Sequence, residues 1–342
     1  MKTLTATVMV KAGRRNGRGG LDALTLSGDD TLFVGGGVSG KDGFYTLNAF
    51  NLNGEQKFEK LGESNGGRIF SLITDLDGNL YAGGVVNSQA FLIKFSESGE
   101  KIWTNYLNEK ESNSGTYALA LDKNNNIYAA DNSASSGVKG NITKFSPEGK
   151  ELWHHNISTE DAEGQINALA VDSEGNIYAG GYTWDDLFET NAGETDAFLV
   201  KIAPDKTHIW EKQWGVEKQD RVNDLIIDDV NNIYVAGGSS GETEILLKFS
   251  SDGKKIWGNE GSAVNYNALA LDEEDNLYVG IGFRKNLVEK YNSDGEKIWN
   301  SNDEGEWEWS VSGIALDSYG NLYICGGKNS NYLIKIPASE ME

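Results

Sequence analysis

The segment 71–103 reads SLITDLDGNLYAGGVVNSQAFLIKFSESGEKIW, and it predicts the fold of the chain. An apolar run ends in Asp75, and a turn of Asp, Gly and Asn leads into Asn79–Tyr81. A Gly pair, a second apolar run, a turn with Gly99 and a final Ile-Trp103 follow. Short apolar runs separated by turn residues are typical of β-strands. We therefore predict four short strands in this segment.

The same pattern recurs along the chain. Its Asn-(Ile/Leu)-Tyr element returns every 44 to 56 residues, at Tyr81, Tyr128, Tyr178, Tyr234, Tyr278 and Tyr323. A degenerate first copy has Phe33 in the Tyr place and Phe58 in the Trp place. A four-stranded repeat of this length is typical of a propeller blade. The sequence predicts an all-β fold: a seven-bladed β-propeller of four-stranded antiparallel blades, with seven repeats spanning about 21–338.

The two ends of the chain are predicted to complete one blade together. The seventh copy stops after its third strand, at Ile336, and an alternating segment at about 4–10 is a spare strand. Pairing these segments closes the ring and leaves no exposed edge. Residues 1–20 are then a closing strand with a Gly/Arg-rich connection. The whole chain, 1–342, is expected to be a single domain and a monomer.

Composition narrows the classes of partner. The net charge is −22, from 52 acidic and 30 basic residues, which disfavours nucleic acid and anionic membranes. No apolar segment approaches the ~20 residues of a membrane span, so no membrane insertion is expected. Cys325 is the single cysteine, so no intramolecular disulfide can form. The first ten residues favour a strand over a signal peptide, so the sequence as it stands suggests a cytoplasmic protein and leaves the localisation open.

Copies four and five resemble the bacterial β-propeller repeat family known as SBBP. The matching elements are Gly181-Tyr182-Thr183, Asp196 to Lys201, Gln213-Trp214-Gly215, Val222-Asn223-Asp224 and Asn232 to Gly237. The resemblance implies a propeller and a secreted or surface-associated protein, and it carries no common activity. The Ile-Trp endings also resemble the tryptophan-docking ends of quinoprotein-type propellers. No cofactor motif accompanies them, so no cofactor is predicted.

Three features that could carry chemistry have structural explanations. The five repeated tryptophans, at Trp103, Trp153, Trp210, Trp257 and Trp299, suit packing between blades. The Asp-rich turns resemble the start of a calcium loop but lack a consistent Glu at the twelfth position. The three histidines, His154, His155 and His208, show no metal or catalytic spacing. We therefore predict no metal ligands and no catalytic residues, although 52 carboxylates leave a catalytic pair open.

Candidate binding residues lie in the loops that enter each innermost strand and in the longest insertion, 182–195. In propellers these loops surround the central channel on one face, so the assignment rests on analogy. The insertion either presents a partner site or folds onto its own blade. The predicted ligand- or partner-binding residues are Arg68, Gln165, Asn167, Trp184, Arg221, Asn223, Asn267 and Trp309.

Three functional hypotheses follow. The first is a non-enzymatic binding or scaffolding propeller whose partner is another protein. The second is a lectin-like propeller that binds a glycan through Trp184, Trp307 or Trp309. The third is a lyase or hydrolase with carboxylates in the central funnel.

Overall fold

The fold is that of a computed structural model. It describes residues 7–12, 20–37, 43–62, 66–107, 114–133, 139–158, 162–239, 246–259, 265–284, 287–301, 309–327 and 331–341. These residues form β-strands and one short 3-10 helix, η2 (Ala338–Glu340), and contain no α-helix. No helix among them is long and apolar enough to span a membrane.

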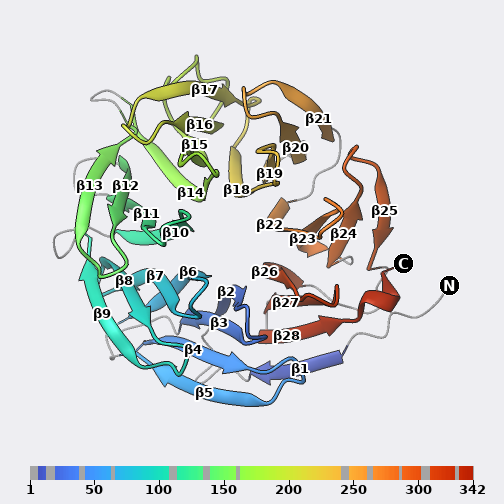
Figure 1. The fold of residues 1–342 in the computed structure, drawn as a ribbon. Helices are drawn as coiled ribbons and strands as arrows, with labels where there is room; N and C mark the ends of the chain where they lie inside the picture. The colour runs from blue at the N-terminus through green and yellow to red at the C-terminus, as the bar shows by residue number, and fades with distance from the viewer. Residues whose placement is uncertain are drawn as a thin grey trace.

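The strands form a ring around a central axis (Figure 1). The strands nearest the centre are β2 (Gly20–Leu26), β6 (Arg68–Thr74), β10 (Gly115–Leu121), β14 (Gly164–Val171), β18 (Asp220–Ile227), β22 (Asn265–Leu271) and β26 (Trp309–Leu316). The next strands outward are β3 (Leu32–Gly37), β7 (Leu80–Val86), β11 (Ile127–Ser133), β15 (Ile177–Thr183), β19 (Ile233–Ser239), β23 (Leu277–Arg284) and β27 (Leu322–Gly327).

The outer half of the ring follows the same order. The third strands are β4 (Tyr45–Phe50), β8 (Gln89–Phe95), β12 (Lys139–Phe145), β16 (Asp196–Ile202), β20 (Leu246–Phe249), β24 (Val288–Tyr291) and β28 (Asn331–Ile336). The outermost strands are β5 (Gln56–Leu61), β9 (Lys101–Tyr106), β13 (Glu151–Asn156), β17 (His208–Trp214), β21 (Lys255–Asn259), β25 (Lys297–Asn300) and β1 (Thr7–Ala12).

Consecutive strands pair antiparallel from the centre outward, as in β14–β15–β16–β17. Contacts between neighbouring runs, such as β3 with β6 and β23 with β26, merge several runs into eight-stranded sheets. One of these contacts is parallel, between Lys139 and Gly164. We call the side with the connections into the innermost strands the loop face, and the opposite side the turn face.

The N-terminal strand pairs with the last strand, as predicted. β1 runs antiparallel to β28, with Thr7 opposite Lys335 and Ala12 opposite Asn331. The described strand extends two residues beyond the predicted segment 4–10, whose first residues lie outside the described part of the chain. Because β1 covers the free edge of β28, the two ends of the ring are joined by a β-ladder.

The turn that follows each innermost strand explains the repeated Asp-Asn-Tyr pattern. Asp172 Oδ1 accepts hydrogen bonds from the backbone N–H groups of Glu174 and Asn176, at 3.0 and 2.8 Å. Its Oδ2 accepts bonds from Asn176 Nδ2 and the Tyr178 hydroxyl, at 2.8 and 3.2 Å. Because both carboxylate oxygens accept hydrogen bonds from these donors, the turn alone accounts for an aspartate at this position. The Asp–Asn bonds recur at Asp75, Asp122, Asp228, Asp272 and Asp317.

The hydrophobic core lies mostly between neighbouring runs of strands. One buried cluster joins Ala118, Tyr128 and Ile142 to Ile166 and Phe198, which belong to the next run. A run of four strands cannot bury both of its faces alone, and stacking around the ring buries them against neighbours. The repeat therefore stabilises the ring rather than each unit by itself.

The repeated tryptophans dock onto the next run of strands. The Trp210 indole N–H donates to the carbonyl of Ser251, at 3.1 Å, in the turn between β20 and β21. Gly253 in that turn has φ +80°, and a Cβ there would lie 2.9 Å from the Trp210 ring. The glycine thus supplies both the left-handed backbone and the space for the indole. Trp103 and Trp257 make the equivalent bonds, to Pro147 and Ser293.

Candidate functional site

Each innermost strand carries one irregularity near the loop face. The register with the neighbouring strand shifts between Val222 and Asp224 in β18, and equivalent shifts occur in the other innermost strands. A bulge re-aims the extra side chain away from the ladder. The residues at the bulges form what we call the bulge ring: Asp22, Phe70, Tyr117, Asn167, Asn223, Asn267 and Ser312.

Three asparagines of the bulge ring clamp neighbouring innermost strands together. Asn167, Asn223 and Asn267 each donate a side-chain N–H to a backbone carbonyl of the next innermost strand, at 2.8 to 3.0 Å. The acceptors are the carbonyls of Val222, Tyr266 and Val311. These predicted binding residues therefore bridge the strands around the channel, where an unpaired carbonyl would be costly.

On the other side of the channel the bulge ring is aromatic and charged. Arg68 donates two hydrogen bonds to the Asp22 carboxylate, both 2.6 Å, and its guanidinium lies 5.4 Å from the centre of the Phe70 ring. Phe70 stacks on Tyr117 with centroids 4.8 Å apart and an angle of 12°. The hydrogen bonds to Asp22 raise the pKa of Arg68, and burial raises the pKa of Tyr117. We call Asp22, Arg68, Phe70 and Tyr117 the arginine–aromatic stack.

A second group on the loop face contains three predicted residues, Gln165, Trp184 and Arg221, together with Tyr182. The Tyr182 hydroxyl donates to Gln165 Oε1 at 2.9 Å, and Trp184 meets the Tyr182 ring edge-on at 4.9 Å. Burial raises the pKa of Tyr182, and the nearby positive charge of Arg221 opposes this rise. Tyr117 also acts electrostatically on Tyr182, so this group adjoins the arginine–aromatic stack. We call it the Tyr182 group.

The insertion 182–195 folds onto its own run of strands. Leu187 is buried in the core cluster, and the Phe188 ring packs edge-on against Phe198 at 5.8 Å. Gln213 holds the loop: its side-chain oxygen accepts from the backbone N–H of Phe188, and its nitrogen donates to the carbonyl of Asp185. Trp184, by contrast, stays 40% exposed. The loop is therefore anchored, and it presents one tryptophan at the surface.

Four side chains of the two loop-face groups, Asp22, Phe70, Tyr117 and Tyr182, were not predicted from the sequence, and the side chain of one predicted residue is not described. The first three occupy the bulge position that Asn167 also occupies. Aligning the bulge positions of the innermost strands would have found Asp22, Phe70 and Tyr117, but not Tyr182, which lies on β15. Trp309 begins β26, but its side chain lies outside the described residues, and so does all of Trp307.

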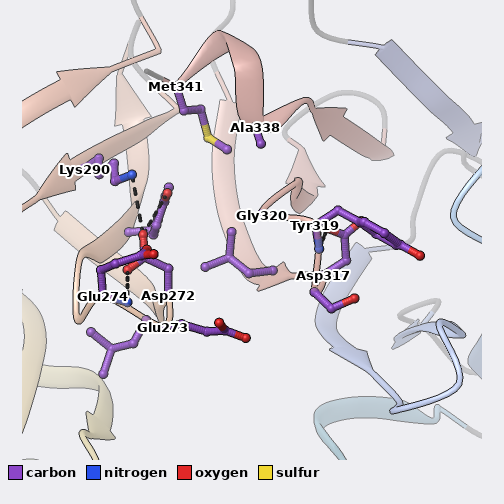
Figure 2. A pocket seen from close by; sticks show the side chains of 13 residues that line it. Asp272, Glu273, Glu274, Lys290, Asp317, Tyr319, Gly320, Ala338 and Met341 are labelled. Carbon is purple, nitrogen blue, oxygen red and sulfur yellow. Dashed lines mark hydrogen bonds and ion pairs between the residues drawn. The ribbon is translucent and has the colours of Figure 1, made fainter.

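A separate pocket opens on the turn face beside the C-terminus. It has a volume of about 540 Å³ and lies between the turns after β22 and β26 and the C-terminal segment. Figure 2 shows Lys290 reaching Asp272 on one side, Tyr319 on the other, and Ala338 and Met341 across from them. The predicted binding residues line none of it. This pocket and the aromatic loop face therefore lie on opposite sides of the ring.

One carboxyl group on the innermost strands has an unusual pKa. Dense packing around Asp224 raises its pKa to about 7, against the lowering effect of hydrogen bonds from the backbone N–H groups of Leu225 and Leu269. A raised pKa is one property of a catalytic acid. Both oxygens of Asp224 are already occupied by these backbone donors, so we assign it a role in strand contact.

Comparison with known proteins defines the class of fold. The sequence model of the SBBP beta-propeller repeat matches residues 153–189, which confirms the resemblance seen in the sequence. No curated protein sequence matches the chain.

Solved structures show the same fold over almost the whole chain. The WD40 beta propeller domain of Doa1 has a TM-score of 0.65 at 12% identity and covers 99% of both chains. The Dos1 propeller has a TM-score of 0.60 at 11% identity and covers 92% of this chain and 77% of its own. A protein of unknown function from Bacteroides caccae has a TM-score of 0.53 at 15% identity and covers 80% and 94%. The protein is an all-β propeller, as predicted.

Proposed function

We propose that the chain is one domain, a seven-bladed propeller in which each run of four strands is a blade, and that it binds another protein through its loop face. The arginine–aromatic stack and the Tyr182 group, which adjoin one part of the bulge ring, carry the functional part of this proposal. The backbone irregularity is the same around the channel, while the side chain at it changes from asparagine to aromatic to acidic. A constant frame with variable side chains is what a binding site on a repeat scaffold requires.

The composition of the two loop-face groups supports a protein partner. Arginine, tyrosine and tryptophan are the residues most enriched at interface hot spots. Arg68 and Arg221 are both exposed on the loop face; the charge of Arg68 is balanced by Asp22, and Arg221 adds positive charge on a chain of net charge −22. The likeness to the WD40 propeller of Doa1 is compatible with this use, although at 12% identity it supports the fold alone.

The test compares two double variants in affinity capture with the intact protein as bait. Trp184→Ala with Arg221→Ala alters the loop face. Leu76→Ala with Tyr319→Ala removes two side chains of the turn face that are 96% and 70% exposed. We expect a partner that the wild type and the turn-face variant retain and the loop-face variant loses. Cross-linking should place that partner within reach of Tyr182. Capture of the same partner by the loop-face variant, or of no partner at all, would contradict the proposal.

The exposed ring of Trp184 favours a glycan as the second candidate. A tryptophan that is 40% exposed beside the Tyr182 hydroxyl offers a stacking surface next to a hydrogen-bonding group. A glycan array separates the two candidates. Saturable binding of one sugar class that Trp184→Ala abolishes would favour the glycan, and an array without signal would favour the protein partner.

A further inference from the structure

Two of the three histidines meet on the outer surface of the ring. His155 lies on β13 and His208 on β17, 53 residues apart in sequence, and their Nε2 atoms are 3.3 Å apart. Their rings are nearly perpendicular, with centroids 5.6 Å apart. The adjacent His154 points away and contacts Thr143 through Nδ1. The contact forms only because the ring places two outermost strands side by side.

Glu211 fixes the orientation of one ring of the pair. The His208 Nδ1 atom lies 2.6 Å from Glu211 Oε1, and because a carboxylate can only accept, this nitrogen carries the proton and its N–H donates the hydrogen bond. The lone pair of His208 Nε2 then accepts the hydrogen bond that His155 Nε2 donates between the rings. A carboxylate that holds the far nitrogen of an imidazole is the usual outer support of a metal-binding histidine.

The separation of the two nitrogens matches that of two ligands on one ion. Zinc–nitrogen bonds are about 2.0–2.1 Å, and at a tetrahedral angle two such nitrogens lie about 3.3 Å apart. Both side chains remain partly exposed, and His208 is 25% exposed, so an ion can reach them from solvent.

We propose that His155 and His208 bind one transition-metal ion of the zinc, nickel and copper class, with Glu211 as the supporting carboxylate. The ion replaces the hydrogen bond between the rings after small side-chain rotations. The His155 proton moves from Nε2 to Nδ1, so both Nε2 lone pairs face the ion. Within the described ranges no group of three His, Cys, Asp or Glu residues could hold an ion together. Water therefore fills the remaining positions, and the ion ties β13 to β17.

The class of ion follows from the ligands. Imidazole nitrogen suits zinc, copper and nickel, whereas magnesium and calcium prefer oxygen. Lys206 lies within electrostatic range of His155 and weakens the site, while the negative charge of Glu211 offsets it. We therefore expect moderate affinity and clear selectivity against magnesium.

The test is calorimetric titration of ZnCl₂, NiCl₂ and MgCl₂ into the full chain, prepared without a polyhistidine tag and dialysed free of metal. We expect one zinc or nickel ion per chain and no binding of magnesium. His155→Gln and His208→Gln should each weaken zinc binding at least tenfold. Glu211→Gln should weaken it about tenfold, as expected for loss of a supporting carboxylate. The matched control His154→Gln, one residue away on the opposite face, should bind as the wild type does.

Two results would overturn the proposal. One is unchanged zinc affinity in His155→Gln, and the other is an equal loss in His154→Gln, which would indicate scattered surface binding. Anomalous diffraction from zinc-soaked crystals gives an independent readout, with a peak expected between the two Nε2 atoms and its absence counting against the site. Circular dichroism of each variant in EDTA verifies that the fold is retained.

Discussion

A tryptophan docks onto the neighbouring strands at two contacts of the ring, but different segments of the chain receive it. The first contact joins β14–β17 to β18–β21, and the second joins β22–β25 to the last strands. In the first, Trp210 docks onto a continuous turn and donates to Ser251. In the second no such turn exists, because β28 ends at Ile336 and its outer neighbour is the N-terminal β1. There the helix η2 takes the place of the turn, and the Trp299 indole N–H donates to the Glu340 carbonyl at 2.9 Å.

The difference shows what the tryptophan site needs. The tryptophan needs a carbonyl oxygen within hydrogen-bonding distance of its indole N–H and room for its ring against the backbone. The C-terminal segment provides both, as the turn between β20 and β21 does. The C-terminal segment does not fill all the space beside it, because the pocket of about 540 Å³ lies there (Figure 2). On the next contact around the ring, Met9 of β1 takes the tryptophan place, with its Cβ 3.1 Å from where a Cβ of Gly54 would be.

The largest expected effect comes from removing the closing strand. Deletion of residues 1–12 exposes the edge of β28 and removes Met9, which packs against the buried cluster of Leu333 and Cys325. We expect loss of cooperative thermal unfolding, or aggregation, because the ring then has an open edge. Adding a peptide of residues 1–12 should partly restore the transition. A deletion variant that melts like the full chain would show that β1 adds nothing to closure.

Truncating the two tryptophans compares the contacts directly. Trp210→Ala should lower the free energy of unfolding by about 3 kcal/mol, the low end of the range for large aromatic residues, because the ring is partly exposed. Trp299→Ala should cost less, about 1–2 kcal/mol, because the C-terminal segment can settle into the space left behind. Urea unfolding measures both. Equal losses would mean that the C-terminal segment is as rigid a partner as the turn.

Alanine variants of two glycines distinguish the cost of a left-handed backbone from the cost of a steric contact with the indole. Gly253 and Gly320 have φ of +80° and +75°, but a Cβ on Gly253 would lie 2.9 Å from Trp210, and one on Gly320 only 3.4 Å from Ala338 Cβ. Gly320→Ala should cost about 1 kcal/mol for the left-handed backbone alone. Gly253→Ala should cost about 1 kcal/mol more, since the indole must shift. In the Trp210→Ala background this extra cost should disappear, and its persistence would contradict the steric explanation.

The smallest expected effect is a change of stability with pH that comes from Asp224, which lies on an innermost strand and contacts the next run. Asp224 accepts a hydrogen bond from Leu269 of the next run, whereas in the contact between β22–β25 and the last strands the equivalent residue is Ala268. Its pKa rises from 3.8 unfolded to about 7 in the native state, so between these values the native state holds a proton that the unfolded state has lost. Stability from this group is therefore full below pH 4 and is lost as pH rises through 7.

Asp224→Asn should remove this contribution. Between pH 5 and pH 7.5 the stability of the wild type relative to Asp224→Asn should fall by about 1 kcal/mol, a discounted value because the side chain is partly exposed. Urea unfolding at both pH values measures the difference. A constant difference would show that Asp224 titrates in its ordinary range.

The strands and the pairing of the two chain ends could be predicted from the sequence, whereas most contacts of the loop face could not. Asp172, Asn176 and Tyr178 are neighbours in sequence, and their local hydrogen bonds shape the turn, so the pattern predicts the element. The stacking of Phe70 on Tyr117 and the meeting of His155 and His208 join residues about 50 positions apart. Such contacts depend on how one run of strands packs on the next, and no local pattern reports that.

The ladder between β1 and β28 also has a mechanical consequence. Thr7 lies opposite Lys335, so the chain leaves both strands at the same end of the ladder. A force that pulls the two termini apart would load the hydrogen bonds one after another, beginning at Thr7, rather than all at once. The ring should therefore unzip at low force even where it resists heat, and a tether attached at both ends would open the propeller along this one strand.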